Sequence, residues 1–204
     1  MMTPEDKYNR IHTFLDSLEL GKFIILTGDN ATGKSLIRRV LWSRVQSLKP
    51  DGRDRGKYIV DTSMERRTGS YEGLGALSGV FRDTPWTATS ENSIHGMEQV
   101  VKITDRFLVF DEPEIGCSLE LQAGMADYIN KHKSEIIENS LGLLIITHSK
   151  IIVERLHEDI FFNMEGMTKD EWLNRKIKPL NIETFKKDAE KTFKFMQKVL
   201  KSAK

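Results

Sequence analysis

The sequence has 204 residues, of which 39% are hydrophobic and 30% are charged, and this composition argues against intrinsic disorder. The 31 basic and 30 acidic side chains give a formal net charge of +1, which excludes a protein that coats nucleic acid by its overall charge. No apolar stretch approaches the roughly 20 residues that cross a bilayer, the first residues lack an apolar signal segment, and the single cysteine excludes an intramolecular disulfide. We therefore expect a soluble, cytoplasmic chain with one main domain.

The first predicted element is a helix near the start of the chain. Thr3 and Pro4 form a helix-start signal, because a hydroxyl caps the first turn and proline fits the first helical position. Its apolar face is predicted to consist of Tyr8, Ile11, Leu15 and Leu18, with Gly21 ending the helix. Residues 22–27 then form a continuous apolar run, which is typical of a strand buried on both faces.

Further strands alternate with helices along the chain. Helical spacing of apolar residues predicts helices between Ile37 and Leu48 and between Leu121 and Ile136. Additional strands are predicted at residues 58–60, 106–110, 141–147 and 160–163. This alternation predicts an α/β fold with a mostly parallel sheet flanked by helices. Residues 63–95 are rich in Gly, Ser, Thr and Arg with little periodicity, and a segment of this length either carries function or contains small elements that the pattern does not reveal.

The last forty residues differ in character from the rest. Thr168 and Glu171 have the spacing of a capping box, and apolar residues at helical spacing predict one long amphipathic helix over residues 181–201. We expect a main domain over residues 1–164 and a C-terminal helical appendage packed on it over residues 165–204.

A glycine-rich loop lies between the first predicted strand and the helix that follows it. It matches the pattern G-x-x-x-x-G-K-[ST] with Gly28, Asp29, Asn30, Ala31, Thr32, Gly33, Lys34 and Ser35. In this pattern backbone N–H groups and the helix N-terminus face phosphate oxygens, the lysine reaches the β- and γ-phosphates, and the hydroxyl binds Mg²⁺. A chance match has a probability of roughly 1%. The loop therefore predicts nucleotide binding, with Lys34 contributing to catalysis and Ser35 to the metal site.

Polar residues follow two of the later strands. Beside a phosphate-binding loop, Asp111 would hold Mg²⁺ and Glu112 would orient and polarise an attacking water. Taken alone, this pair also fits an ordinary solvated turn. His148 follows the fourth strand, and the carboxyl end of a parallel strand faces the ligand crevice. It would donate a hydrogen bond to the γ-phosphate, or else cap the next helix.

The motifs GDNATGKS, FLVFDEPEIG and LLIITHS, in this order, resemble the ATP-binding-cassette class of P-loop ATPases. The likeness is closest to the non-transporter branch, which includes the heads of SMC, RecF and RecN-like proteins and the overcoming-lysogenization-defect ATPases. The resemblance covers residues 22–163 and makes residues 1–164 a P-loop ATPase domain that binds ATP and Mg²⁺. It implies that Asp111 is the Walker B aspartate, Glu112 the catalytic glutamate and His148 the switch histidine.

The same family places a signature motif before the Walker B strand, where it contacts ATP held by a second subunit. Residues 93–98 are the nearest candidate, with Ser93 and Gly96 contacting the nucleotide, and the alternative is a plain helix cap. A working signature implies an ATP-dependent homodimer.

Two stretches are locally basic, which bears on the partners of the chain. Lysines and arginines cluster between residues 38 and 67, and residues 165–204 carry eleven basic against six acidic side chains. Such stretches are mostly solvated helix faces, and they also fit contact with nucleic acid or an acidic protein.

The sequence as a whole predicts an ATP hydrolase that is slow without a partner. Its hydrolysis cycle is expected to drive or regulate the formation of a dimer, or an interaction with a partner protein or DNA, and no membrane is expected to take part. Two alternatives stay open. One is a P-loop kinase that transfers phosphate to a small acceptor, with Arg53 and Arg55 closing over ATP. The other is a switch protein that binds ATP without hydrolysing it.

Overall fold

The computed structural model describes residues 2–29, 32–34, 37, 40, 41, 44, 45, 59–61, 90, 93, 94, 97, 98, 101–176, 179 and 181–202. These residues contain a five-stranded sheet in the order β2-β3-β4-β1-β5, in which every neighbouring pair is parallel. The strands are Phe23–Thr27 (β1), Ile59–Asp61 (β2), Phe107–Asp111 (β3), Gly142–Ile146 (β4) and Ile160–Asn163 (β5). The predicted α/β class and the parallel sheet are confirmed.

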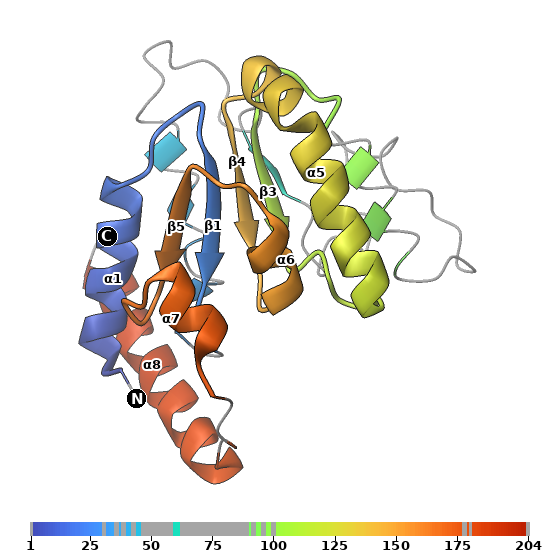
Figure 1. Cartoon of the computed structure of the whole chain (residues 1–204). Coiled ribbons are helices and arrows are strands. Elements are labelled where there is room, and N and C mark those ends of the chain that lie inside the picture. The colour runs from blue at the N-terminus through green and yellow to red at the C-terminus, as the bar shows by residue number, and fades with distance from the viewer. Residues whose placement is uncertain are drawn as a thin grey trace, which may run out of the picture.

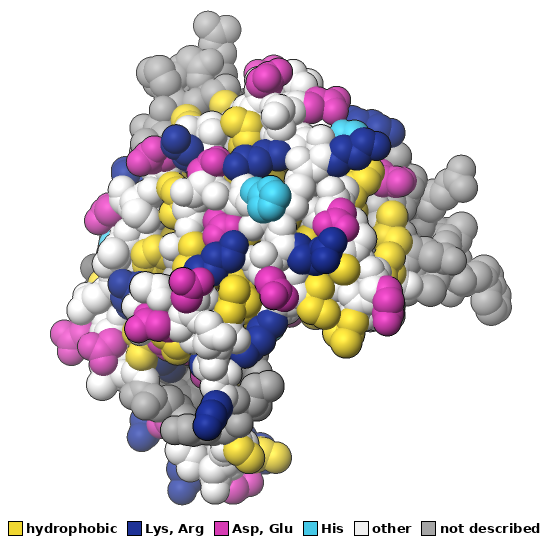
Figure 2. All heavy atoms as spheres, in the orientation of Figure 1, with side chains coloured by type: hydrophobic (Ala, Val, Ile, Leu, Met, Phe, Trp, Pro, Cys, Tyr) yellow, Lys and Arg dark blue, Asp and Glu magenta, His cyan; other side chains and the backbone are white. Residues whose placement is uncertain are grey.

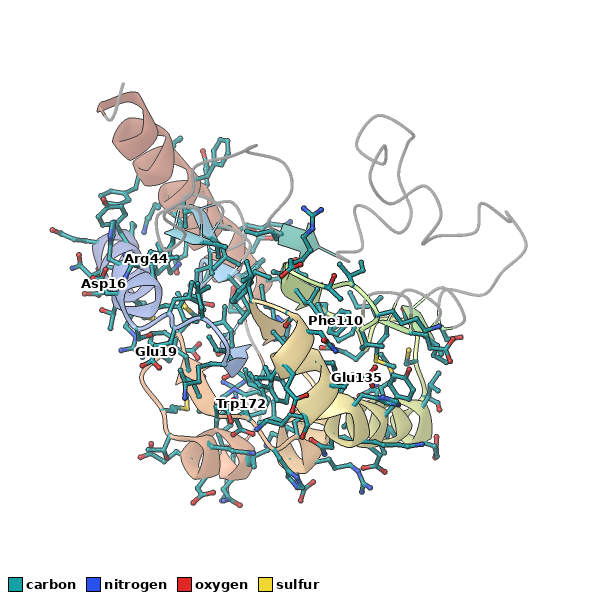
Figure 3. The ribbon with its side chains drawn as sticks, turned by 90° about the horizontal axis from the view of Figure 1, so that it is seen from above. Asp16, Glu19, Arg44, Phe110, Glu135 and Trp172 are labelled. Carbon is teal, nitrogen blue, oxygen red and sulfur yellow. The ribbon has the colours of Figure 1, made fainter. Side chains whose placement is uncertain are left out.

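Helices cover both faces of this sheet (Figure 1). They are Pro4–Asp16 (α1), Leu119–Asn139 (α5), Lys150–Arg155 (α6), Lys169–Asn174 (α7) and Ile182–Ser202 (α8). Seen from above, α1 lies on one side of the sheet together with Arg44, and α5 to α7 lie on the other side together with Trp172 (Figure 3). Within the described part of the chain, no helix has both the length and the apolar character that spanning a membrane requires.

The central strand β1 supplies side chains to the core on both faces of the sheet. Phe23 and Ile25 join the cluster that contains Trp172 and the inner faces of α5 and α6. Ile24 and Leu26 join the cluster on the α1 side. All four are at most 1% exposed, as the uninterrupted apolar run predicts for a strand covered on both faces.

The helix α1 begins as predicted but ends earlier than predicted. The Thr3 side chain accepts a hydrogen bond from the Asp6 N–H at 3.1 Å, and Asp6 reciprocates, which forms a capping box. The helix ends at Asp16, so the prediction that Gly21 ends it is wrong. Gly21 instead adopts a φ of 72° and donates its N–H to the Leu141 carbonyl at 2.9 Å, which aligns the chain for β1.

The buried face of α1 also differs from the prediction. Ile11 is buried as predicted and Phe14 joins it in the core against the sheet, while Lys7 is buried where α8 packs against α1. Lys7 Nζ donates to Thr192 Oγ1 at 2.9 Å. Burial lowers the pKa of Lys7 because it disfavours the charged ammonium, although the negative charge of Asp188 acts to raise this pKa.

The C-terminal elements follow the predicted pattern. The capping box of Thr168 and Glu171 opens α7, and α8 confirms the predicted long helix. Trp172 of α7 is 1% exposed and belongs to the core beneath the sheet, so α7 is packed into the same body as the strands. The proposed division at residues 164 and 165 stays a prediction.

Candidate functional site

Three strand ends meet at one edge of the sheet and define the candidate site. Since β4 lies between β1 and β3 and all three run in the same direction, the segments that follow them leave the sheet side by side. The arrowheads in Figure 1 point toward this edge, where α6 and α7 also lie. These segments are the glycine-rich loop (residues 28–35), the Asp111–Glu112 pair and His148, so the fold brings together motifs that are spread over residues 28–148 of the sequence.

The glycine-rich loop passes close to the chain that follows β5. A Cβ atom on Gly28 would lie 2.8 Å from Met164 Cβ and 2.9 Å from Thr32 Oγ1, so a side chain does not fit there. Gly33 has a φ of 105°, Lys34 is helical, and the Ile37 N–H donates to the Gly33 carbonyl at 3.1 Å. A helix therefore starts directly at the loop, as an anion site requires. Asn30, Ala31 and Ser35 lie outside the described residues.

Lys34 lies inside the loop with a 7% exposed side chain. Its Nζ donates to the carbonyl oxygens of Gly28 and Asp29, at 2.9 Å in both cases. Burial lowers the pKa of Lys34 to about 8, although nearby carboxylates, Glu112 foremost, favour the charged form. The ammonium is therefore mostly charged at neutral pH. Burial is the main effect that disfavours this charged form.

The acidic pair at the end of β3 is partly buried, unlike an ordinary solvated turn. The Glu112 N–H donates to the Ile146 carbonyl of β4 at 2.8 Å, and the Glu112 backbone has a φ of 50°. A left-handed backbone is costly for a residue with a side chain and is often found at functional sites. Asp111 and Glu112 both act electrostatically on Lys34, so the predicted metal-binding and catalytic carboxylates do lie near the lysine.

His148 faces Glu112 across the site. Its Nε2 lies 3.3 Å from Glu112 Oε1, and its backbone N–H donates to Glu114 Oε1 at 2.8 Å. The residue that caps α6 is Ser149, whose Oγ accepts from the Ile152 N–H, so the alternative role of His148 as a helix cap is wrong. His148 Nε2 is buried and makes no hydrogen bond to any described residue.

The predicted magnesium site is only partly described. The described residues include no group of three or more His, Cys, Asp or Glu placed to hold a metal. Magnesium commonly binds through one or two carboxylates, waters and substrate phosphates. Asp111, the predicted carboxylate ligand, lies at the end of β3, and the predicted second ligand, Ser35, lies outside the described residues.

Two residues beyond β5 contact the glycine-rich loop, and sequence reasoning missed both. The Asp29 N–H donates to Glu165 Oε1 at 2.9 Å, and Arg175 Nη2 lies 2.7 Å from Asp29 Oδ1. Both partners are more than 130 residues from Asp29 and belong to no motif, so no signal in the sequence pointed to them.

The remaining candidate residues are only partly described. Ser93 lies within a helical stretch and is 5% exposed, and Gly96 lies outside the described residues, so the signature assignment stays a prediction. Most of the basic cluster between residues 38 and 67 is also outside them, and Arg44 donates through Nε to the Leu15 carbonyl at 2.9 Å. Figure 2 shows basic and acidic side chains interspersed over the face that it displays.

The comparisons with known proteins add no assignment. No protein-family model matches the chain, and the search of curated proteins finds no significant relative.

Proposed function

We propose that this chain is a P-loop ATPase that binds Mg-ATP at the glycine-rich loop and hydrolyses the terminal phosphate. The observation that carries this proposal is the arrangement of three strand ends, with Lys34 after β1, Asp111 and Glu112 at the end of β3, and His148 after β4. Each of these residue types has a distinct part in hydrolysis, and the strand order supports their acting on one substrate.

The loop would bind the triphosphate through charge and backbone N–H groups. Lys34 would give up its contacts with two carbonyl oxygens and bind phosphate oxygens instead, which are stronger partners because they are charged. The close approach at Gly28 leaves no room for a side chain, so the backbone itself can line the phosphates. Magnesium, held by Asp111 and Ser35, would supply additional positive charge against the phosphates.

Glu112 would orient the attacking water and accept its proton. Its carboxylate is held at the strand end by an unusual backbone conformation and lies opposite His148. His148 Nε2 lies near Glu112 but makes no hydrogen bond to a described residue, and it would donate to a γ-phosphate oxygen, an acceptor that suits it. This division of roles favours transfer to water over transfer to a second small substrate.

The test is phosphate release from Mg-ATP by the wild-type chain and by Lys34→Ala and Glu112→Gln. We expect Lys34→Ala to lose nucleotide binding, and Glu112→Gln to bind ATP but turn it over at least a hundredfold more slowly, on the order of the loss of a general base. Glu135→Gln is the matched control, because this carboxylate is 62% exposed on α5 and lies outside the site.

The same measurement separates the alternatives. ADP formation that depends on an added small acceptor would favour the kinase, and tight ATP binding without turnover, with or without DNA, would favour the switch protein. A folded wild-type chain that binds no nucleotide would overturn the proposal.

A further inference from the structure

The segment that follows β5 makes two polar contacts with Asp29 of the glycine-rich loop. The Asp29 N–H is bonded to the Glu165 carboxylate, and the Asp29 carboxylate is paired with Arg175 at 2.7 Å. Asp29 thus has one anionic partner and one cationic partner, both from a part of the chain that carries no recognised motif.

Carboxylates crowd this loop, which disfavours the binding of a phosphate chain. Asp29 and Glu165 both act electrostatically on the Lys34 ammonium, and they stabilise its charge. The same two charges must oppose a phosphate group that binds to Lys34, since the sign of the interaction reverses. Glu165 Oε2 is buried and makes no hydrogen bond to any described residue, so its negative charge is not fully compensated.

Arg175 is the group that offsets the charge of Asp29. Its position is fixed from three directions within the described residues. The guanidinium pairs with Asp29, its carbon lies 5.3 Å from the centre of the Trp172 ring, and its backbone carbonyl accepts from Lys150 Nζ at 3.0 Å. Because Trp172 is buried in the core, the arginine is attached to a rigid support.

The support of Arg175 also connects to the opposite side of the site. Lys150 is the first residue of α6 and follows His148 by two positions, and its Nζ donates to the Leu173 and Arg175 carbonyls at the end of α7. The end of α7 therefore bridges the strand end that carries His148 and the loop that carries Lys34.

We propose that Arg175 is a positioning residue of the nucleotide site, which neutralises the Asp29 carboxylate and so permits a triphosphate to bind the glycine-rich loop. This inference rests on the function proposed above. The position of α7 would then influence nucleotide affinity. If α7 moved and Arg175 left Asp29, the negative charge of Asp29 would repel the phosphates.

The test is a double-mutant cycle on the full chain, with affinities for Mg-ADP and for a non-hydrolysable Mg-ATP analogue measured by calorimetry. We expect Arg175→Gln to weaken binding by up to about fivefold, the upper end for a partly exposed charge pair, and more for the triphosphate than for the diphosphate. Adding Asp29→Asn should restore most of the lost affinity. Since the effect is electrostatic, the loss should shrink at high salt.

The control pair is Arg155 with Asp127. It joins the same residue types at the same 2.7 Å, between α6 and α5, and neither residue contacts the described part of the glycine-rich loop. Arg155→Gln should leave both nucleotide affinities unchanged.

Each outcome decides the inference separately from the proposed function. If the wild-type chain binds no nucleotide, the ATPase proposal fails and this inference fails with it. Two outcomes in a wild-type chain that binds nucleotide would overturn the inference alone. In the first, Arg175→Gln binds nucleotide as well as wild type does, and in the second, Asp29→Asn does not rescue the lost affinity. Either outcome would show that Arg175 has no electrostatic role. If Arg175→Gln does not fold, the single variant Asp29→Asn decides, and it must bind the triphosphate more tightly than wild type does.

Discussion

At the scale of a single residue, the charge of Lys34 is the central feature of the candidate site. Its ammonium is buried, held by two carbonyl oxygens and surrounded by carboxylates, and burial lowers its pKa to about 8. A phosphate group favours the charged form, so nucleotide binding must raise this pKa. Binding and protonation are therefore linked.

The linkage predicts the pH dependence of nucleotide affinity. Below about pH 8 the ammonium is already charged, and Lys34 adds no pH dependence. As the pH rises through about 8, the free chain loses this proton while the complex keeps it, so affinity should fall by up to about tenfold per pH unit. Calorimetry with Mg-ADP between about pH 7 and about pH 9.5 measures this. A flat profile in a chain that stays folded would contradict the assignment.

His148 offers a second prediction at this scale. His148→Ala should keep ADP affinity, because the proposed contact is with the γ-phosphate alone, and it should slow ATP turnover by about tenfold to a thousandfold. Parallel ADP and ATP titrations with steady-state phosphate release provide the measurement. If ADP and ATP weaken equally, His148 is a structural residue.

Residues within motifs were predictable, and residues that act from a distance were not. Lys34, Asp111, Glu112 and His148 each follow a predicted strand, and the spacing of a parallel sheet is enough to bring them to one edge. Arg175 reaches the same loop through tertiary packing of α7, which no local pattern encodes.

At the scale of elements, continuous apolar runs predict the bounds of the strands more accurately than helical periodicity predicts the bounds of the helices. The bounds of β1, β3 and β4 lie within about one residue of the prediction, because a buried strand is apolar throughout and ends where polar residues begin. The predicted end of α1 lies too late in the sequence. Leu18 continues the helical spacing of apolar residues, but in the structure it is buried after the helix has ended at Asp16.

The short helix α7 is stabilised mainly by Trp172. The side chain is 1% exposed, lies in the core cluster beneath the sheet, and its indole N–H makes no hydrogen bond to any described residue. Its contribution is therefore apolar packing. Trp172→Ala should lower the free energy of unfolding by about 3–5 kcal/mol, measured by denaturant titration.

The matched control for this change is Phe193→Ala on α8. Phe193 is 63% exposed, so its removal should change the free energy of unfolding by less than about 0.5 kcal/mol. Equal losses from the two variants would show that Trp172 is not an anchor of α7.

At the scale of the whole molecule, the family resemblance predicts a two-fold dimer that closes on ATP. Glu112→Gln keeps the shape of the side chain but removes the charge that polarises water, so this variant should accumulate as an ATP-bound dimer. Size-exclusion chromatography with and without Mg-ATP tests this. Adding Gly96→Asp should prevent dimer formation while leaving ATP binding intact. A variant that saturates with ATP and stays monomeric would contradict the dimer mechanism.

The position of β1 in the sheet has a consequence for the way this chain folds as it is synthesised. β1 is made early, and its two neighbours, β4 and β5, follow more than a hundred residues later. Until residue 146 has left the ribosome, the four apolar residues of this interior strand have no neighbouring strand to pair with. Such long-range parallel pairing is slow, and an unpaired apolar strand invites aggregation. We therefore expect chaperone capture of nascent chains that stop before β4, and release once β5 has formed.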